Sequence, residues 1–357
     1  TPSLFEGWGG GEQGIVPLPG KKHAHQMRAA ILYDLIPLIY QNQYLDPNPA
    51  IKEWYLERID ILQNFDLLLA ISEATRQDAI NVLGISPSKV VNISGAASSH
   101  FKKIHLSEEQ RKHFLERLGI SRPYVLYIGG NDFRKNMEGA IRAYAKLPGE
   151  IINTHQLVLN DVGDEFYFRR KASKFGLDEE DLVIIKRISD EDLILLYNLC
   201  KLFIFPSLYE GFGLPVLEAM SCGAPVLASN NSSLPEVVGR EDALFEVSDE
   251  QAIAKSIHKV LTNDDFRLDL AEYGLKNSQK FSWDISARRA WKALETTHRN
   301  NKINRNQNEK VSIKESHPRL KVAYVSPLPP QKSGIADYSA DLLPHLAELF
   351  DIDLFAQ

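Results

Sequence analysis

The stretch Phe205-Pro-Ser-Leu-Tyr-Glu210-Gly-Phe-Gly-Leu-Pro-Val-Leu-Glu218-Ala-Met-Ser-Cys-Gly223 begins with the end of an apolar run, Leu202-Phe-Ile-Phe205, which predicts a short buried strand. The glycines between the two glutamates allow the backbone to approach a ligand closely. Pro215 suits the first helical position and Gly223 the left-handed position just past a helix end, so a helix is expected over residues 215–222. The N-terminus of such a helix presents unpaired N–H groups and the positive end of its dipole, which together form a site for an anion such as a diphosphate.

Two glutamates flank the loop in a Glu-x7-Glu pattern. Glu210 precedes the helix and Glu218 lies one turn inside it, so the two carboxylates can reach different parts of one ligand. Carboxylates accept hydrogen bonds from sugar hydroxyls, and with the anion site they indicate a nucleotide-sugar site. The alternative is an ordinary strand-turn-helix with two surface acids. The glycine loop between the acids and the next apolar run at residues 225–229 favour the nucleotide-sugar site.

Positive groups are the second requirement for sugar transfer, because negative charge grows on the leaving diphosphate. Arg134 and Lys135 follow an apolar run at residues 124–128 that predicts the first strand of a parallel sheet. Such sheets bind ligands at the carboxyl ends of their strands, so this pair is a candidate for holding the diphosphate. The alternative is a solvated Arg-Lys pair in a surface loop.

Further motifs accompany these residues at 127–136, 188–193, 232–239 and 281–283. Together with residues 205–223 they resemble the signature of family 4 retaining glycosyltransferases, also called glycosyltransferase group 1, and most of all bacterial mannosyltransferase-type enzymes that build surface polysaccharides. The resemblance implies an α/β protein with the GT-B fold, in which two Rossmann-like domains have parallel sheets that face across a cleft. It also implies transfer of a hexose, with a mannose-like sugar favoured, from a GDP- or UDP-sugar to a glycan or lipid-linked saccharide.

The resemblance gives each motif a role. Lys135 would hold the diphosphate with support from Arg134. Glu218 would bind the ribose hydroxyls, and Glu210 would lie beside the transferred sugar. Backbone N–H groups of the loop would hold the donor sugar and phosphate, and these belong to Gly211, Phe212, Gly213 and Leu214.

The acceptor domain supplies one candidate. Tyr33 stands where many relatives have histidine, which leaves Asp34 as the better candidate for a polar catalytic role. The alternative is an inward-facing aromatic beside a helix-capping aspartate.

No metal is implied by the sequence. His23-x-His25 has no nearby third ligand, and Asp351-x-Asp353 alternates with apolar residues in an expected strand. The nucleotide sugar is therefore a substrate, and no cofactor is expected. A glycosidase with two carboxylates is disfavoured because the anion-binding loop would then lack a purpose. Two further classes stay open, which are a non-catalytic scaffolding unit of a polysaccharide assembly and another GT-B activity such as a nucleotide-sugar epimerase.

Composition sets the remaining limits. The 357 residues suggest two to three domains, and 44% hydrophobic residues can support sizeable cores. The net charge of −6, without a long basic run, argues against a nucleic-acid partner.

Cys200 and Cys222 lie in apolar segments and are expected to be core thiols. Free thiols suit a reducing compartment, so a cytoplasmic location is expected. No apolar stretch reaches the roughly 18 residues of a membrane span. Peripheral contact with the inner face of a membrane and a homodimer stay open.

Alternating strand and helix patterns divide the chain. Strands are expected at residues 30–34 and 66–71, then at 124–128, 156–159, 182–185, 202–205 and 225–228, and after a polar stretch at 321–325 and 352–355. The expected domains are a partial acceptor domain at 1–120, a nucleotide-sugar-binding Rossmann-like domain at 121–298, a linker at 299–318 and the start of a second acceptor domain at 319–357. The chain is thus expected to be a piece of a tandem enzyme, whose last segment either docks onto the first domain or frays.

Overall fold

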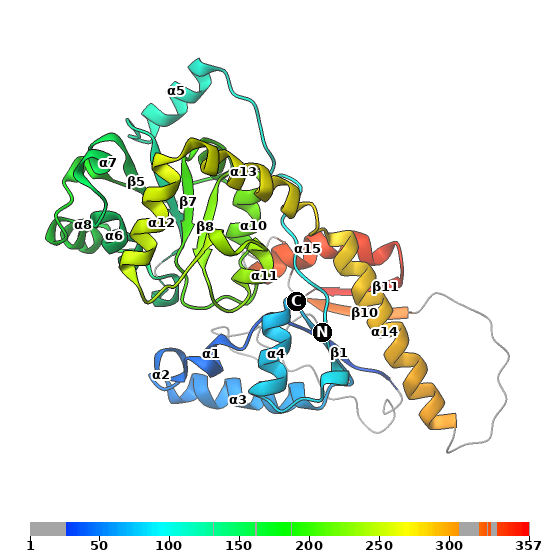
Figure 1. Ribbon diagram of the computed structural model, residues 1–357. Coiled ribbons are helices and arrows are strands. Elements are labelled where there is room, and N and C mark those ends of the chain that lie inside the picture. Colours follow the sequence, from blue (N-terminus) through cyan, green and yellow to red (C-terminus); the bar gives the residue numbers. More distant parts are fainter. Residues whose placement is uncertain are drawn as a thin grey trace. The chain divides into compact units, whose positions relative to one another are not determined.

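The computed structural model describes residues 26–130, 132–160, 163–186, 188–306, 321–326, 328–329 and 334–356. The described chain is α/β and forms two compact units (Figure 1). Unit 1 combines the described residues up to Gly95 with those from Ser282 onward, and unit 2 runs from Ala96 to Phe281. The boundaries that the sequence placed near residues 120 and 298 stay a prediction about which segments fold alone.

Unit 2 is built on one parallel sheet of six strands in the order β6-β5-β4-β7-β8-β9. Counted from β4, this is the Rossmann order 3-2-1-4-5-6, which reverses between β4 and β7. The strands are β4 (Tyr124–Ile128), β5 (Gln156–Asn160), β6 (Leu182–Ile185), β7 (Leu202–Phe205), β8 (Val226–Ser229) and β9 (Leu244–Phe245). The predicted α/β fold is confirmed, and each of the five strands expected here lies within one residue of its observed bounds.

Helices cover both faces of this sheet. Nearly every residue of β4, β5, β7 and β8 is buried, as a parallel sheet between two helical layers requires. Helix α6 packs against α8 and α12, whereas α10 packs against α9 and α13. The helices are α5 (Glu108–Arg117), α6 (Met137–Ala145), α7 (Gly149–Thr154), α8 (Glu165–Lys174), α9 (Asp190–Leu199), α10 (Leu214–Ser221), α11 (Leu234–Val238), α12 (Glu250–Thr262) and α13 (Asp264–Ser278). Single 3-10 turns lie at Phe133–Lys135, Glu179–Asp181 and Glu241–Ala243.

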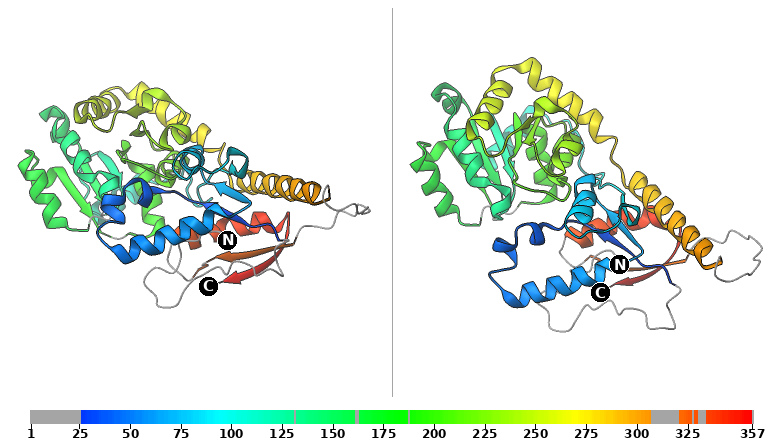
Figure 2. Two further views of the ribbon diagram at one scale, coloured as in Figure 1. Left: turned by 90° about the horizontal axis from the view of Figure 1, so that it is seen from below. Right: turned by 60° about the horizontal axis from the view of Figure 1, so that its bottom comes forward.

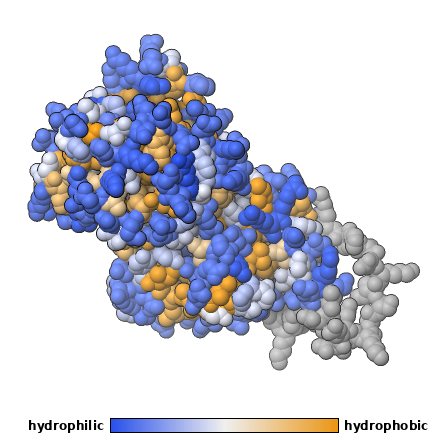
Figure 3. All heavy atoms as spheres, in the orientation of Figure 1, coloured by the Kyte–Doolittle hydropathy of each residue, from blue (hydrophilic) through white to orange (hydrophobic). Residues whose placement is uncertain are grey.

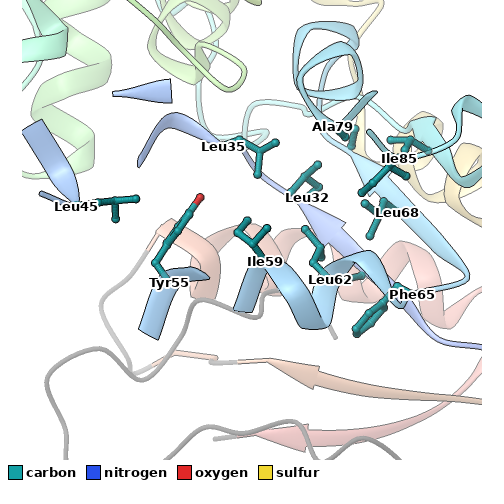
Figure 4. Packing of buried hydrophobic residues seen from close by; sticks show 13 residues of the cluster. Leu32, Leu35, Leu45, Tyr55, Ile59, Leu62, Phe65, Leu68, Ala79 and Ile85 are labelled. Carbon is teal, nitrogen blue, oxygen red and sulfur yellow. The ribbon is translucent and has the colours of Figure 1, made fainter. Parts of the chain in front are cut away.

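Unit 1 begins with a three-stranded parallel sheet in the order β1-β2-β3. One face of α3 covers it, and Figure 4 shows Tyr55, Ile59 and Leu62 of this helix in one apolar cluster with Leu32 and Leu68 of the strands. These residues recur every three or four positions, which is the spacing of one helix face. The elements are β1 (Ala29–Leu32), α1 (Ile36–Ile39), α2 (Gln41–Tyr44), α3 (Pro49–Gln63), β2 (Leu67–Ala70), α4 (Glu73–Asn81), a 3-10 turn (Pro87–Lys89) and β3 (Val90–Asn92).

The C-terminal part of unit 1 adds two helices and two strands. They are α14 (Trp283–Asn306), β10 (Lys321–Ser326), α15 (Gly334–Ala347) and β11 (Asp351–Ala356). Strands β10 and β11 pair in parallel and form a sheet of their own, apart from the three strands of the first part. The predicted linker is helical as far as Asn306, where α14 ends, and its remaining residues lie outside the described part of the chain.

Helix α15 packs against earlier residues of unit 1. Tyr338 makes edge-to-face contacts with Tyr33, at 5.1 Å between ring centroids, and with Trp283, at 4.6 Å. Phe350, just beyond the helix, contacts Trp291 at 4.6 Å. Figure 2 shows α15 beside α14 from two directions. These contacts are of the kind that docking onto the first part of the chain requires, but docking and the tandem-enzyme interpretation both stay predictions.

Replacing Tyr338 by alanine is expected to lower the free energy of unfolding of unit 1 by about 3 kcal/mol, because truncation of a buried ring leaves a cavity between two aromatic neighbours. Tyr338 is only 5% exposed. Urea denaturation followed by tryptophan fluorescence measures the loss. Leu354→Ala on β11 is the control, since Leu354 is 50% exposed and its truncation should cost little. Equal losses in the two variants would contradict the packing of α15.

The visible face of each unit carries mainly hydrophilic residues, with apolar residues scattered among them (Figure 3). Scattered apolar residues are normal on a folded surface. Within the described ranges, no helix combines the length and the apolar character needed to cross a membrane.

Candidate active site

The candidate site lies where the strand order of unit 2 reverses. Strands β4 and β7 are neighbours there, and Val125 pairs with Leu202. Arg134 and Lys135 follow β4, and Glu210 follows β7. Doubly wound sheets bind ligands outside the carboxyl ends of their strands at this reversal. The topology therefore brings together two motifs that lie about 75 residues apart in the sequence.

The carboxylate of Glu210 joins the two motifs. Arg134 Nη1 donates to Oε2 at 2.8 Å, and Lys135 Nζ donates to Oε1 at 2.7 Å. Arg134 Nη1 also donates to the carbonyl oxygen of Tyr209 at 2.7 Å. Glu210 is only 6% exposed, and hydrogen bonds between ionised groups are about twice as strong as neutral ones. The structure thus brings together Arg134, Lys135 and Glu210 of the predicted catalytic residues.

Three serines that the sequence motifs did not single out hold Glu210 in place. Ser207 Oγ donates to Oε1 at 2.5 Å. Ser232 Oγ accepts the backbone N–H of Glu210 at 2.9 Å, and Ser233 Oγ donates to its carbonyl oxygen at 3.0 Å. Ser207 lies three residues before Glu210 in one loop, so its proximity could have been inferred. The other two follow β8, and only the strand order places them beside this loop.

The two cations are held by the turn that follows β4. Asp132 Oδ1 accepts the N–H of Arg134 at 2.9 Å, and Asp132 Oδ2 lies 3.5 Å from Arg134 Nη2. Tyr127 donates its hydroxyl to the carbonyl oxygen of Lys135 at 3.1 Å. Lys135 Nζ lies 5.0 Å from the centroid of the Phe205 ring, a cation–π distance. Residues of β4 and β7 therefore fix both the backbone and the head group of Lys135.

The glycine loop leads into α10 through a left-handed residue. Gly213 has φ 99°, and its carbonyl oxygen accepts the N–H of Val216 at 3.0 Å. A Cβ added at Gly213 would come within 2.7 Å of Leu234 Cδ2. Helix α10 begins and ends one residue earlier than predicted, and Gly223 takes φ 78° just past it, as predicted.

Gly213→Ala is expected to destabilise the protein by about 2 kcal/mol, because the left-handed backbone and the contact with Leu234 both oppose a side chain. Thermal unfolding measures the change. Gly149→Ala is the matched control, since Gly149 is the first residue of α7 and a Cβ there meets nothing within 4 Å. A loss no larger than that of the control would contradict the conformation of the loop.

Glu218 lies on α10 and differs from Glu210 in having no lysine or arginine at hydrogen-bond distance among the described residues. Burial raises the pKa of its carboxyl from 4.5 to about 7. The hydroxyl of Tyr197, which donates to Oε2 at 3.3 Å, and the charge of Lys135 partly oppose this increase, whereas Asp190 adds to it. Burial thus keeps Glu218 close to its titration point at neutral pH.

Residues 109–277 match the sequence model of the family described as glycosyl transferases group 1. This segment is a glycosyl transferases group 1 domain. It contains every predicted site residue of unit 2, which are Arg134, Lys135, Glu210, Gly211, Phe212, Gly213, Leu214 and Glu218.

Curated relatives of the chain include two bacterial mannosyltransferases. The chain is 41% identical over 261 residues to the serotype-specific mannosyltransferase WbdA of Escherichia coli, which covers 72% of this chain and 32% of the relative. It is 34% identical over 241 residues to the O-antigen chain mannosyltransferase B of Escherichia coli, which covers 66% of this chain and 63% of the relative. The chain therefore spans about a third of the length of WbdA.

Solved structures show the same fold as this chain. HepE from Anabaena in complex with UDP-glucose superposes with a TM-score of 0.61 at 18% identity, over 76% of this chain and 72% of the other. Sucrose-phosphate synthase from Thermosynechococcus elongatus gives 0.58 at 23% identity, over 79% of this chain and 68% of the other. At these identities the likeness concerns the fold, and the expected GT-B fold is confirmed.

Outside the glycosyl transferases group 1 domain, Asp34 lies in unit 1. Its Oδ1 accepts the N–H of Ile36, the first residue of α1, at 3.0 Å, although the N-cap residue of this helix is Leu35. A catalytic role for Asp34 stays a prediction. His23-x-His25 lies outside the described residues, and Asp351 and Asp353 are exposed on β11. Within the described ranges, no three His, Cys, Asp or Glu side chains gather as ligands for a metal ion.

Proposed function

We propose that the chain is part of a retaining glycosyltransferase that moves a hexose, with a mannose-like sugar favoured, from a GDP- or UDP-sugar to a glycan or lipid-linked saccharide. One observation carries the proposal, which is the cluster of Arg134, Lys135 and Glu210 where the strand order reverses. The names of the curated mannosyltransferase relatives support the choice of sugar.

The two cations would stabilise the leaving group. As the glycosidic bond breaks, negative charge grows on the diphosphate, and fixed positive groups are most effective where that charge develops. Lys135 would contact the diphosphate directly, and Arg134 would support it, because both head groups already converge on one point. Two such cations supply the charge that a divalent metal supplies in other sites, so we propose that the transfer needs no metal.

The two glutamates would bind hydroxyl groups of the donor. Glu210 follows β7 beside the cations and would accept hydrogen bonds from the transferred sugar, and Glu218 on α10 would accept them from the ribose. Backbone N–H groups of residues 211–214 would contact the sugar and phosphate, as helix N-termini commonly do.

The experiment is calorimetric titration of the whole chain with GDP-mannose and UDP-glucose, followed by an assay of the protein for transfer to saccharide acceptors. Binding of one donor is expected, with transfer and retention of the anomeric configuration. Failure to bind any nucleotide sugar would refute the proposal. Binding without transfer would favour a scaffolding unit, and an epimerised nucleotide sugar as product would favour an epimerase.

A further inference from the structure

The positive side chains of the candidate site are already paired with carboxylates of the same site. Glu210 accepts hydrogen bonds from three side chains, Arg134 at 2.8 Å, Lys135 at 2.7 Å and Ser207 at 2.5 Å. Asp132 adds a second carboxylate 3.5 Å from Arg134. Two positive charges thus face two negative ones, and the carboxylate of Glu210 occupies the position between the cations that a phosphate oxygen would use.

A diphosphate cannot share this position with the carboxylate. It carries at least two negative charges, and like charges within about 4 Å repel strongly where water is excluded. Water is largely excluded from this cluster, since the side chains of Arg134, Lys135 and Glu210 are 14%, 18% and 8% exposed. A diphosphate that binds Arg134 and Lys135 must therefore displace Glu210 from them.

The displaced carboxylate needs new donors, because a buried carboxylate without hydrogen bonds is costly. Sugar hydroxyls are suitable donors. A nucleotide sugar supplies both the diphosphate that displaces Glu210 and the sugar hydroxyls that then donate hydrogen bonds to its carboxylate. A nucleoside diphosphate supplies the diphosphate but lacks the transferred sugar.

We infer that Glu210 competes with the diphosphate for Arg134 and Lys135, so that the site retains the nucleotide sugar and releases the nucleoside diphosphate. This inference rests on the proposed function and gives Glu210 a role in product release. The competition lowers the apparent affinity for a diphosphate by the fraction of molecules in which the cations are accessible. If Glu210 holds them in about nine molecules of ten, the affinity falls about tenfold.

Ser207 is the positioning residue of this competition. Its hydroxyl can donate only one hydrogen bond. The 2.5 Å contact with Glu210 Oε1 is shorter than the 3.1 Å contact with the carbonyl oxygen of Arg134, so Ser207 donates its hydrogen bond to the carboxylate. Ser207 is fully buried. It therefore holds Glu210 in the orientation that faces the two cations.

The test is equilibrium binding of inorganic pyrophosphate, GDP, UDP, GDP-mannose and UDP-glucose to the whole chain. Glu210→Gln keeps the shape of the side chain and removes its charge, and it should bind pyrophosphate and the preferred nucleoside diphosphate about tenfold more tightly. The preference for the nucleotide sugar over the nucleoside diphosphate should shrink. Glu250→Gln is the matched control, since Glu250 also pairs with an arginine and a lysine, Arg142 at 2.7 Å and Lys146 at 3.6 Å.

A second variant keeps the test decisive if Glu210→Gln folds poorly. Ser207→Ala retains the charge of Glu210 but loosens its orientation, and it should tighten pyrophosphate binding about threefold. Unchanged or weaker diphosphate binding in the folded variants, with normal binding by the wild type, would overturn the competition and leave the proposed function standing. Absence of all nucleotide binding by the wild type would remove both.

Discussion

Replacing Lys135 by alanine is expected to lower the rate of sugar transfer by about 100- to 1,000-fold, the usual cost of losing one fixed charge that stabilises a developing anion. Lys135 Nζ lies 2.7 Å from Glu210 Oε1 and 5.0 Å from the Phe205 ring centroid, so its position is fixed before a substrate arrives. Steady-state kinetics with a saturating donor measures the effect.

The control for this prediction is Lys171→Ala. Lys171 also pairs with a glutamate, Glu138 at 3.1 Å, but it lies on α8 and outside the cluster around Glu210. Its removal should change transfer by less than about twofold. Comparable rates for the two variants would mean that Lys135 does not contact the diphosphate. A loss of turnover together with a lower melting temperature of the Lys135 variant would instead point to misfolding.

Replacing Glu218 by glutamine is expected to stabilise the protein at pH 8 by up to about 3 kcal/mol. Its pKa rises from 4.5 to about 7 on folding, and each unit corresponds to about 1.4 kcal/mol. Folding favours the protonated carboxyl, so the stability that this group contributes is fully present below pH 4.5 and is lost as the pH rises through 7. An amide has no charge to desolvate, so the variant should gain at pH 8 and change little at pH 4.5.

Urea denaturation at pH 4.5 and pH 8 measures this difference, and Glu138→Gln is the control of opposite sign. Burial raises the pKa of Glu138, but hydrogen bonds from Lys171 and Tyr167 and the charges of Lys171 and Arg142 outweigh it, and the net shift is downward. Glu138→Gln should therefore lose stability at pH 8. A gain at pH 8 in both variants, or in neither, would contradict the environment assigned to Glu218.

The same Glu218 variant should bind a nucleotide sugar more weakly. An ionised carboxylate accepts hydrogen bonds from both ribose hydroxyls, whereas an amide offers one acceptor oxygen. Donor binding by the wild type should accordingly weaken as the pH falls through about 7, where Glu218 takes up a proton. Titrations at pH 6 and pH 8 with wild type and variant separate this effect from the change in stability.

Local structure was readable from the sequence because it depends on neighbours along the chain. Apolar runs located β4, β5, β6, β7 and β8. Gly223 was correctly expected in the left-handed position after α10. The motif around Glu210 also indicated the family, since it is one continuous stretch from the end of β7 through the loop and α10.

Only the tertiary structure decided which side chains meet. Glu210 reaches Lys135 because β7 lies beside β4, and the order of strands in a sheet follows from long-range packing rather than from local pattern. The high pKa of Glu218 arises from burial on α10, and the contact of Tyr338 with Tyr33 from packing of α15 near β1. The sequence by itself therefore determined five of the strands of unit 2, the left-handed turn after α10 and the candidate residues of this protein. The fold decided their partners, charges and burial, because these depend on distances between residues far apart in the chain.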